Sequence, residues 1–326
     1  MLFRSDVIIA IIDTGVYYNH PHLSSNILVN SIEVHGNERD YIDQDENGYR
    51  DDYVGWDFYN GDAYPIDDNG HGTHVAGLAA GTLMGIAPKA KILPVKVLGS
   101  SGQGDLATIA AGIMYALDRG ADVINLSLGG PGGNQISAEV QNVVNIIQMA
   151  QKSNAMIVAA AGNGGSDGIG DCNDSSPVYP ANIQEENLIS VASVNLYNEL
   201  TEYSNYGSST VHIAAPGGDV YTGALSSTGI PFCEQECGAD DIVYANSMGT
   251  SMATPIVSGV IAAMKSKAPN LGFKMIKENI FPIILIGAAN VALPFFFFSI
   301  VWLNFQFKWF QFLGILIGMS GLVVFV

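Results

Sequence analysis

Apolar runs of strand length alternate with segments of helical periodicity from Val7 to about Lys267. This alternation constrains the fold more than any other feature, because parallel strands need a crossover connection and that connection is usually a helix. It predicts an α/β fold, a doubly wound, mostly parallel sheet with helices on both faces. The apolar runs expected to form the strands are residues 7–12, 92–97, 123–128, 156–161, 188–194 and 211–214.

One segment between the expected strands has a clear amphipathic pattern. Its apolar side chains recur at helical spacing and form a single stripe, made of Ile136, Val140, Val143, Val144 and Ile147. A stripe of this kind is typical of a helix that packs on a sheet, so the sequence predicts a helix that covers one face of the sheet here.

The charge balance limits the partners of this chain. Its 326 residues include 31 acidic and 13 basic side chains, which gives a formal net charge of −18 and an isoelectric point near 4.4. So acidic a protein repels phosphate backbones and anionic lipid surfaces. Nucleic acid is therefore not an expected partner.

The last part of the chain has a different composition. Residues 280–303 form an apolar run without a charged side chain, and residues 309–326 form a second, shorter run. Spanning a bilayer takes about 20 apolar residues, and aromatic side chains such as those found here favour membrane interfaces. We therefore divide the chain into a domain at residues 6–269 and a hydrophobic tail at 270–326, with two transmembrane helices that would associate with a membrane. A buried pair of core helices is the alternative.

The sequence GTSMATP, Gly249 to Pro255, is an unusual start for a helix. A serine in the opening turn lies beside unpaired backbone N–H groups and the positive end of the helix dipole, so an anion that forms next to its Oγ would be stabilised. Ser251 is therefore a candidate nucleophile. Taken alone, the motif also fits an ordinary helix cap at Thr250 or Ser251.

Two further motifs supply the groups that a nucleophilic serine needs. IIDTGV ends an expected strand with Asp13, at the edge of a parallel sheet where α/β proteins hold their sites. DDNGHGTHVAG places His71 between two glycines that leave its imidazole accessible. A histidine activates a hydroxyl when a carboxylate orients its other ring nitrogen. The competing interpretation pairs His71 with His74 as metal ligands, without a third ligand at motif spacing.

Four motifs then point to one family. IIDTGV, NGHGTHVAG, AAAGN and GTSMATP occur in this order, and residues 7–267 resemble the subtilisin-like (subtilase) serine peptidases. The resemblance implies a subtilisin-like fold and a serine endopeptidase. It also implies a catalytic triad of Asp13, His71 and Ser251, with Asn163 as a donor to the oxyanion.

The resemblance further places the segments that bind peptide or protein substrates. SLGG and LGSSGQG look like the two extended segments that pair with the substrate backbone as an added strand. Small, uncharged walls next to them predict broad specificity, with a preference for large apolar side chains before the cleaved bond (the P1 position). The residues assigned to substrate binding are Ser127, Leu128, Gly129, Gly99, Ser100, Gly102, Ala160, Ala161 and Gly162.

An acidic segment between Glu33 and Asp68 contains oxygen ligands at alternating positions and a glycine for a sharp turn, resembling a calcium loop. It lacks the glutamate that closes an EF-hand loop. The sequence thus predicts a structural calcium ion, with a solvated acidic loop as the alternative, and no cofactor for catalysis. The expected ligands are Asp43, Asp45, Asn47 and Asp51.

Some segments depart from the family pattern. His22 stands where the family commonly has a calcium-binding aspartate, and the short stretch before the first strand looks like a non-native leader in place of a signal or pro-segment. The tail loosely resembles segments of drug/metabolite transporters, which leaves an inactive remnant or a chimeric membrane fragment as the alternative to an active peptidase. By family analogy we expect the protein outside the cytoplasm, secreted or membrane-anchored.

Overall fold

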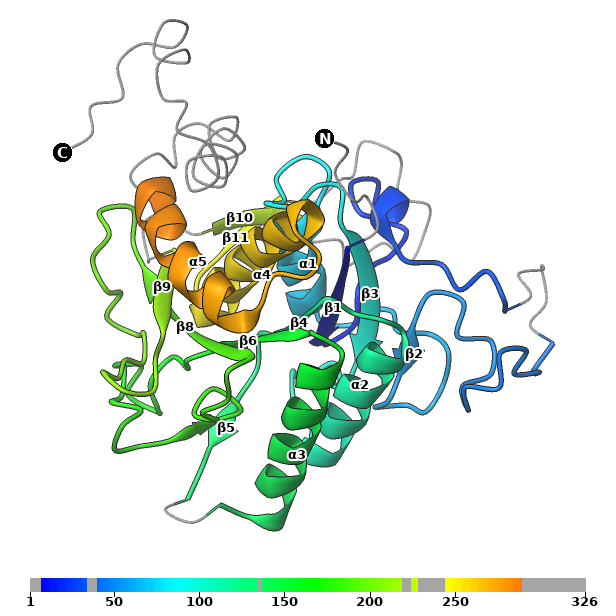
Figure 1. The fold of residues 1–326 in the computed structure, drawn as a ribbon, viewed down its shortest axis with the longest axis horizontal. Coiled ribbons are helices and arrows are strands. Elements are labelled where there is room, and N and C mark those ends of the chain that lie inside the picture. The colour runs from blue at the N-terminus through cyan, green and yellow to red at the C-terminus, as the bar shows by residue number, and fades with distance from the viewer. Residues whose placement is uncertain (1–6, 34–39, 134–135, 219–223, 228–243, 289–326) are drawn as a thin grey trace, which may run out of the picture.

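The computed structural model describes residues 7–33, 40–133, 136–218, 224–227 and 244–288, and Figure 1 shows their arrangement. A seven-stranded sheet forms the centre of the described part, in the order β2-β3-β1-β4-β6-β8-β9. Every neighbouring pair in this sheet is parallel. Its strands are β1 (Ile8–Asp13), β2 (Trp56–Asp57), β3 (Lys91–Lys96), β4 (Val123–Leu126), β6 (Met156–Ala160), β8 (Leu188–Val194) and β9 (Ile213–Pro216).

Helices cover both faces of this sheet, as the apolar runs of the strands require. On one face, α1 (His71–Ala80) and α4 (Thr250–Lys267) pack into a core with β1, β6 and β8. On the other face, α2 (Leu106–Asp118) and α3 (Ala138–Lys152) build a second core. Figure 1 shows these two helix layers on opposite sides of the strands. The fold is therefore the doubly wound α/β architecture that the sequence predicts.

The direction of winding reverses at β1. The chain passes from β1 through α1 to β3 on one side, and then through α2 to β4 on the other side. Such a reversal leaves a crevice at the carboxyl end of the strand, because the two crossover connections leave it in opposite directions. Asp13, the last residue of β1, lies at this point.

The predicted strands all form, with ends shifted by at most two residues. The predicted amphipathic helix forms as α3, but it begins at Ala138 after the cap Ser137. Ile136 therefore lies before the helix and is 55% exposed, which corrects its assignment to the apolar stripe. Val143 and Ile147 of that stripe are buried in the core.

Several short elements were not predicted. A 3-10 turn covers Ser24–Asn26, and two small antiparallel pairs join β5 (Gly130–Pro131) to β7 (Val178–Tyr179) and β10 (Ala224–Ser227) to β11 (Tyr244–Ser247). Strands of two to four residues show little periodicity, so their pairing depends on contacts between distant segments.

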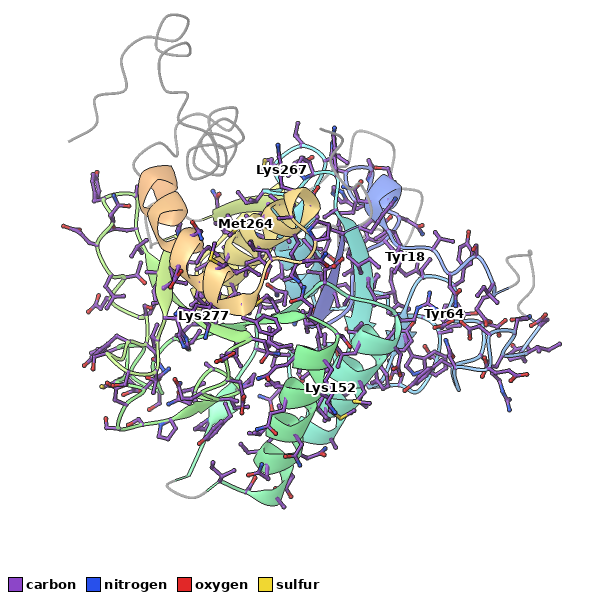
Figure 2. All side chains as sticks on the ribbon, viewed as in Figure 1. Tyr18, Tyr64, Lys152, Met264, Lys267 and Lys277 are labelled. Carbon is purple, nitrogen blue, oxygen red and sulfur yellow. The ribbon has the colours of Figure 1, made fainter. Side chains whose placement is uncertain are left out.

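The helix α5 (Phe273–Ala288) contains the start of the predicted tail. Its Ile276 and Ile280 are buried in the same core as α1 and α4, so this helix packs on the domain. Met264 of α4 and Lys277 of α5 mark the two neighbouring helices in Figure 2. The division of the chain at residue 269 stays a prediction.

The membrane spans predicted at 280–303 and 309–326 fall largely on residues that the structure does not describe. Within the described ranges, no helix combines the length and the hydropathy needed to cross a bilayer.

Candidate active site

Asp13 ends β1 with its side chain completely buried. Its Oδ1 accepts a hydrogen bond of 2.7 Å from the backbone N–H of Thr14 and another of 2.7 Å from Nδ1 of His71. Because the carboxylate can only accept, Nδ1 of His71 carries the proton and Nε2 of the neutral ring is left as an acceptor. The structure thus brings together two of the predicted catalytic residues, which are 58 positions apart in the chain.

His71 is the first residue of α1, and a buried carboxylate fixes the turn before it. Asp67 accepts hydrogen bonds from the backbone N–H groups of Gly70 and Thr73 and from both hydroxyl groups of Thr14 and Thr73. Thr14 in turn accepts from the backbone N–H of Gly72 at 2.9 Å. These contacts tie the start of α1 directly to the end of β1.

A glycine allows α1 to approach β1 this closely. A Cβ at Gly72 would lie 2.0 Å from the carbonyl oxygen of Gly15, a distance at which no side chain fits. The small residue after His71 therefore has a steric role, in addition to the access to the imidazole that the sequence suggested.

The pKa of His71 is raised above its ordinary value of 6.5. Burial by itself lowers this pKa, but the negative charge of Asp13, its hydrogen bond and the more distant charge of Asp67 outweigh burial. Near neutral pH the ring is therefore poised to gain a proton, as a general base must be.

Ser251 is the second residue of α4, after the cap Gly249 with φ of 149°. Its Oγ donates a hydrogen bond of 3.1 Å to the carbonyl oxygen of Ser127, and Oγ of Ser127 donates one of 2.8 Å to the carbonyl oxygen of Ser251. Pro255 explains the second bond, because proline has no N–H to offer the carbonyl four residues earlier in a helix. The cap is Gly249, so neither Thr250 nor Ser251 caps the helix, and their hydroxyl groups donate to Asn163 and Ser127.

Asn163 follows β6 and faces the start of α4. Its Oδ1 accepts hydrogen bonds from the backbone N–H of Thr250 at 2.8 Å and from the hydroxyl of Thr250 at 2.9 Å. Both bonds occupy the carbonyl end of the amide, so Nδ2 is the end that remains to donate. Asn163 is exposed and lines the same cleft as Ser251.

A single cleft of about 910 Å³ contains these groups. His71, Asn163 and Ser251 line it, and Asp13 lies directly behind His71. Of the predicted substrate-binding residues, those that line the cleft are Gly102, Ser127, Leu128, Gly129, Ala160 and Gly162.

The remaining predicted substrate residues are not among those that line the cleft. Ala161 is completely buried, and Gly99 is buried beside Tyr59. Ser100 accepts a hydrogen bond from the side chain of Asn69 through its carbonyl oxygen. The sequence did not identify the part of the cleft lining formed by Asp171 and residues 175–179, because this segment carries no motif.

The second predicted site lies in the acidic segment, away from the cleft. Carboxylate oxygens of Glu33, Asp43 and Asp45 lie within 4.8 Å of one another. Asn47, another predicted ligand, donates to Asp45 through its amide and accepts from the backbone of Tyr49 through Oδ1. Glu33 was not among the predicted ligands, since it lies outside the regular spacing of the motif.

The alternative pairing of His71 with His74 as metal ligands is not favoured by the geometry. Nε2 of His74 lies 3.1 Å from the carbonyl oxygen of Ala245 in β11, whereas Nδ1 of His71 contacts Asp13. The two rings are therefore held by different parts of the protein.

The fold and this cleft match the class of subtilisin-like serine endopeptidases. The model of the subtilase family (Peptidase_S8) matches residues 4–282, and the chain belongs to this family. It is therefore a hydrolase of peptide bonds in peptides or proteins. The family match includes the start of α5 and gives no support to a transporter-like tail.

Three similar proteins illustrate the relationship. Thermitase from Thermoactinomyces vulgaris is 38% identical over 265 residues, which cover 79% of this chain and 75% of thermitase. The major intracellular serine protease of Bacillus subtilis (strain 168) is 33% identical over 264 residues, or 79% of this chain and 68% of that protein. The crystal structure of a cold adapted subtilisin-like serine proteinase matches with a TM-score of 0.63 and 27% identity, over 85% of this chain and 81% of the other.

Proposed function

We propose that Ser251 is the nucleophile of this peptidase, with His71 as its general base and Asp13 as the group that orients the imidazole. Ser251 would attack the peptide carbonyl while Nε2 of His71 takes its proton and later returns it to the leaving amine. Asp13 would stabilise the imidazolium that forms between these two transfers. The observation that carries the proposal is the buried Asp13–His71 hydrogen bond at the wall of the cleft that also contains Ser251.

In the described conformation Ser251 donates to Ser127 and not to His71. Activation therefore requires the hydroxyl of Ser251 to turn from the carbonyl of Ser127 toward Nε2 of His71. Hydrogen bonds of this kind are often loose in a ligand-free site and tighten when substrate binds. The weak bond of 3.1 Å to Ser127 is consistent with such a change.

Asn163 would stabilise the negative charge of the tetrahedral intermediate. Thr250 holds the carbonyl end of its amide, so Nδ2 is available to donate to an oxyanion in the cleft. The backbone N–H of Ser251, at the positive end of the α4 dipole, would supply the second donor. Both donors are fixed before substrate arrives, which is what makes such a site effective.

The test combines covalent labelling with peptide hydrolysis. A fluorophosphonate probe should label the full chain, and the variant Ser251→Ala should lose both labelling and hydrolysis. Ser153→Ala, a change of an exposed serine at the end of α3, should keep both. An unlabelled parent protein would instead indicate an inactive remnant, and labelling of Ser251→Ala would exclude Ser251 as the nucleophile.

For the substrate, we propose that residues 98–104 and 127–130 bind an extended peptide between them. Support comes from the cleft, since Leu98 and Leu128 line it together with small residues of both segments. We also propose a preference for apolar side chains at P1, because Ala160 and Gly162 are small and uncharged. Digestion of a peptide library checks this, and predominant cleavage after lysine or arginine would contradict it.

We propose that the acidic segment binds a structural calcium ion. Its donors are all oxygen atoms, which is the ligand type that calcium prefers. Besides the group of Glu33, Asp43 and Asp45, Oδ1 of Asp51 and Oε1 of Gln44 are buried without a hydrogen-bond partner in the described structure. Buried oxygens of this kind would be satisfied by a cation, so the residues fit calcium. When bound, the ion would neutralise the cluster and hold the segment together.

For the location, we propose that the protein acts outside the cytoplasm. The proposal rests on analogy with the family alone, and the Bacillus subtilis relative is by name intracellular. Attachment to a membrane through the tail stays a prediction about residues outside the described ranges. Fractionation of cells that express the full chain checks both statements, since recovery of the protein only from the soluble cytoplasm would contradict them.

A further inference from the structure

The turn that carries Asn163 lies outside regular secondary structure. After β6 ends at Ala160, Gly162 and Gly164 adopt positive φ angles of 112° and 73°. The backbone groups of such a turn cannot pair within a strand or helix, and buried groups must find other partners. The position of the Asn163 amide therefore depends on what binds the backbone around it.

Asn205 binds this turn from two sides. Its backbone N–H donates to the carbonyl of Gly162 at 2.9 Å, and its side-chain Oδ1 accepts from the N–H of Gly164 at 2.7 Å. The two contacts flank Asn163 directly. The same Oδ1 also accepts from the N–H of Asp171 at 3.0 Å, which connects the turn to another residue that lines the cleft.

Asn173 completes the support. Its Nδ2 donates to the carbonyl of Ala161 at 2.8 Å, and its Oδ1 accepts from Nδ2 of Asn205 at 2.9 Å. The backbone of Asn173 is itself fixed by Tyr206 and by the side chain of Asn182. Asn173 and Asn205 thus form a pair of hydrogen-bonded amides that together bind the backbone of Ala161, Gly162 and Gly164, on both sides of Asn163.

The pair is buried and closely fitted. Asn173 is 1% exposed and Asn205 is 2% exposed. A Cβ at Gly162 would lie 2.6 Å from Nδ2 of Asn205, so the amide packs directly against the turn. Buried hydrogen bonds of this kind are costly to break, because the partners left behind have no water to replace the lost bond. The two side chains should therefore restrict the turn to one conformation.

We infer that Asn173 and Asn205 are positioning residues that hold the Asn163 amide where the oxyanion forms, an inference that rests on the oxyanion role proposed for Asn163. Asn173 does not line the cleft. Asn205 does, but its amide is already bound to the backbone of Gly164 and Asp171 and to Asn173, so both side chains would act through Asn163. A displacement of about 1 Å at a catalytic group can reduce the rate by about 10²-fold. The pair should accordingly affect the rate of the chemical step more than the binding of substrate.

The first experiment compares Asn205→Ala in the full chain with Asn187→Ala. Asn187 is an equally buried asparagine that lies just before β8, away from the cleft. Its Nδ2 donates to the carbonyls of Ile147 and Ala155. Both changes should lower the melting temperature. Only Asn205→Ala should lower kcat, by roughly 10- to 100-fold, with KM changed less than about twofold. A peptide boronate, whose tetrahedral adduct places an oxygen in the oxyanion position, should lose affinity in parallel with kcat.

The second experiment separates positioning from general damage. In an Asn163→Ala background there is no amide left to position, so adding Asn205→Ala should lower kcat by less than about twofold. Near-additive effects would show that Asn205 acts independently of Asn163 and would overturn the inference. The same background distinguishes the two proposals, since an unchanged rate in Asn163→Ala itself would count against the oxyanion role.

Asn173→Asp provides a variant that preserves shape. The change retains an acceptor oxygen for Asn205, replaces the donor to Ala161 with a second oxygen that cannot donate when ionised, and adds a buried negative charge. It should reduce kcat and boronate affinity in the same proportion as Asn205→Ala, even where the alanine variant fails to fold. If Asn173→Asp folds and keeps the kcat and boronate affinity of the parent protein, the pair does not position Asn163.

Discussion

The cleft and the acidic segment hold their functional groups in opposite ways. In the cleft, Asp13 ends a central strand and His71 and Ser251 begin helices, so each group is carried by an element packed in the core. In the acidic segment, carboxylates such as Asp43 are held largely by N–H groups of the same loop. The groups of the cleft are thus positioned by packed elements, whereas the acidic segment contains two buried side-chain oxygens, in Gln44 and Asp51, without a hydrogen-bond partner in the described structure.

This difference in support matches what each region needs: the cleft must be ordered before substrate binds, and the acidic segment can become ordered when an ion binds. A triad must be ready before its substrate arrives, and the packed elements of the sheet provide that order. A calcium loop can gain part of its order from the ion, because binding to the folded state stabilises it. We therefore expect changes in the cleft to alter activity, and changes in the loop to alter stability.

The largest expected effect comes from the buried carboxylate of the cleft. Asp13→Asn should lower kcat by about 10⁴-fold, because an amide can hold the imidazole in the wrong tautomer and cannot stabilise its charge. Asp45→Asn, the same change in the acidic segment, should leave kcat within about twofold below the melting temperature. Steady-state hydrolysis of a peptide substrate measures kcat for both variants. Comparable losses in kcat would contradict the expected difference between the cleft and the acidic segment.

The pH dependence of activity should also reveal the effect of the Asp13 carboxylate, which acts on the pKa of His71. Because Asp13 raises the pKa of His71 above 6.5, kcat/KM should fall on acidification through that raised pKa, by about tenfold per pH unit. The contribution of His71 to stability changes with pH in the opposite direction. The folded-state pKa exceeds the unfolded one, so the stabilising contribution of His71 is complete below the unfolded pKa and is lost as pH rises through the folded pKa.

A profile of kcat/KM against pH for the parent protein and Asp13→Asn checks this assignment. Loss of the negative charge should move the acid limb of the variant to lower pH. An acid limb at the same pH in both proteins would assign it to another group.

Removal of calcium should lower the stability of the protein and leave the rate of peptide hydrolysis unchanged. At a calcium concentration of about 100 Kd the ion contributes about 2.7 kcal/mol, which corresponds to a fall in melting temperature of roughly 5–10 °C when EDTA is added. Glu33→Gln should weaken the response to calcium, whereas Glu46→Gln, an exposed residue of the same loop, should retain it. A melting temperature that does not respond to EDTA would remove calcium from the proposal.

The smallest effect should come from the contact between the loop and the core. Tyr115 of α2 is 1% exposed and donates a hydrogen bond of 2.7 Å to Oδ2 of Asp52. Burial and the charge of Asp52 together raise the pKa of this phenol, so it remains a donor at all working pH values. Tyr115→Phe should cost about 1–2 kcal/mol in urea unfolding without a change in kcat. Tyr41→Phe, at a ring that is 75% exposed, is the matched control and should be neutral.

The predictions from sequence succeeded where the signal was local and regular. Strand positions follow from apolar runs that must be buried on both faces of a parallel sheet, so the major strands were found. Asp13 and His71 were expected to lie together and are hydrogen-bonded in the structure, because one ends a strand and the other begins a helix. The amphipathic helix was placed correctly, except that the cap Ser137 excludes Ile136.

The predictions were less complete where partners come from distant segments without a repeating pattern. Neither Glu33 in the acidic cluster nor the wall at residues 175–179 carries a motif that would point to the site. The bond from Ser251 to Ser127 and the support of the turn by Asn173 and Asn205 are likewise invisible in the sequence. Such contacts depend on how the loops pack against one another after the sheet has formed.

The sequence by itself thus determined the layered architecture, because the apolar side chains of the strands must be buried. It also determined the types of reactive group at the carboxyl edge of the sheet, because these residues follow the ends of the strands. Only the tertiary structure decided which oxygen each hydroxyl contacts, which carboxylates converge and which amides hold the turn at Asn163. Those choices depend on differences of a few tenths of an ångström in the packing of irregular segments, and hydrophobic periodicity carries no information about them.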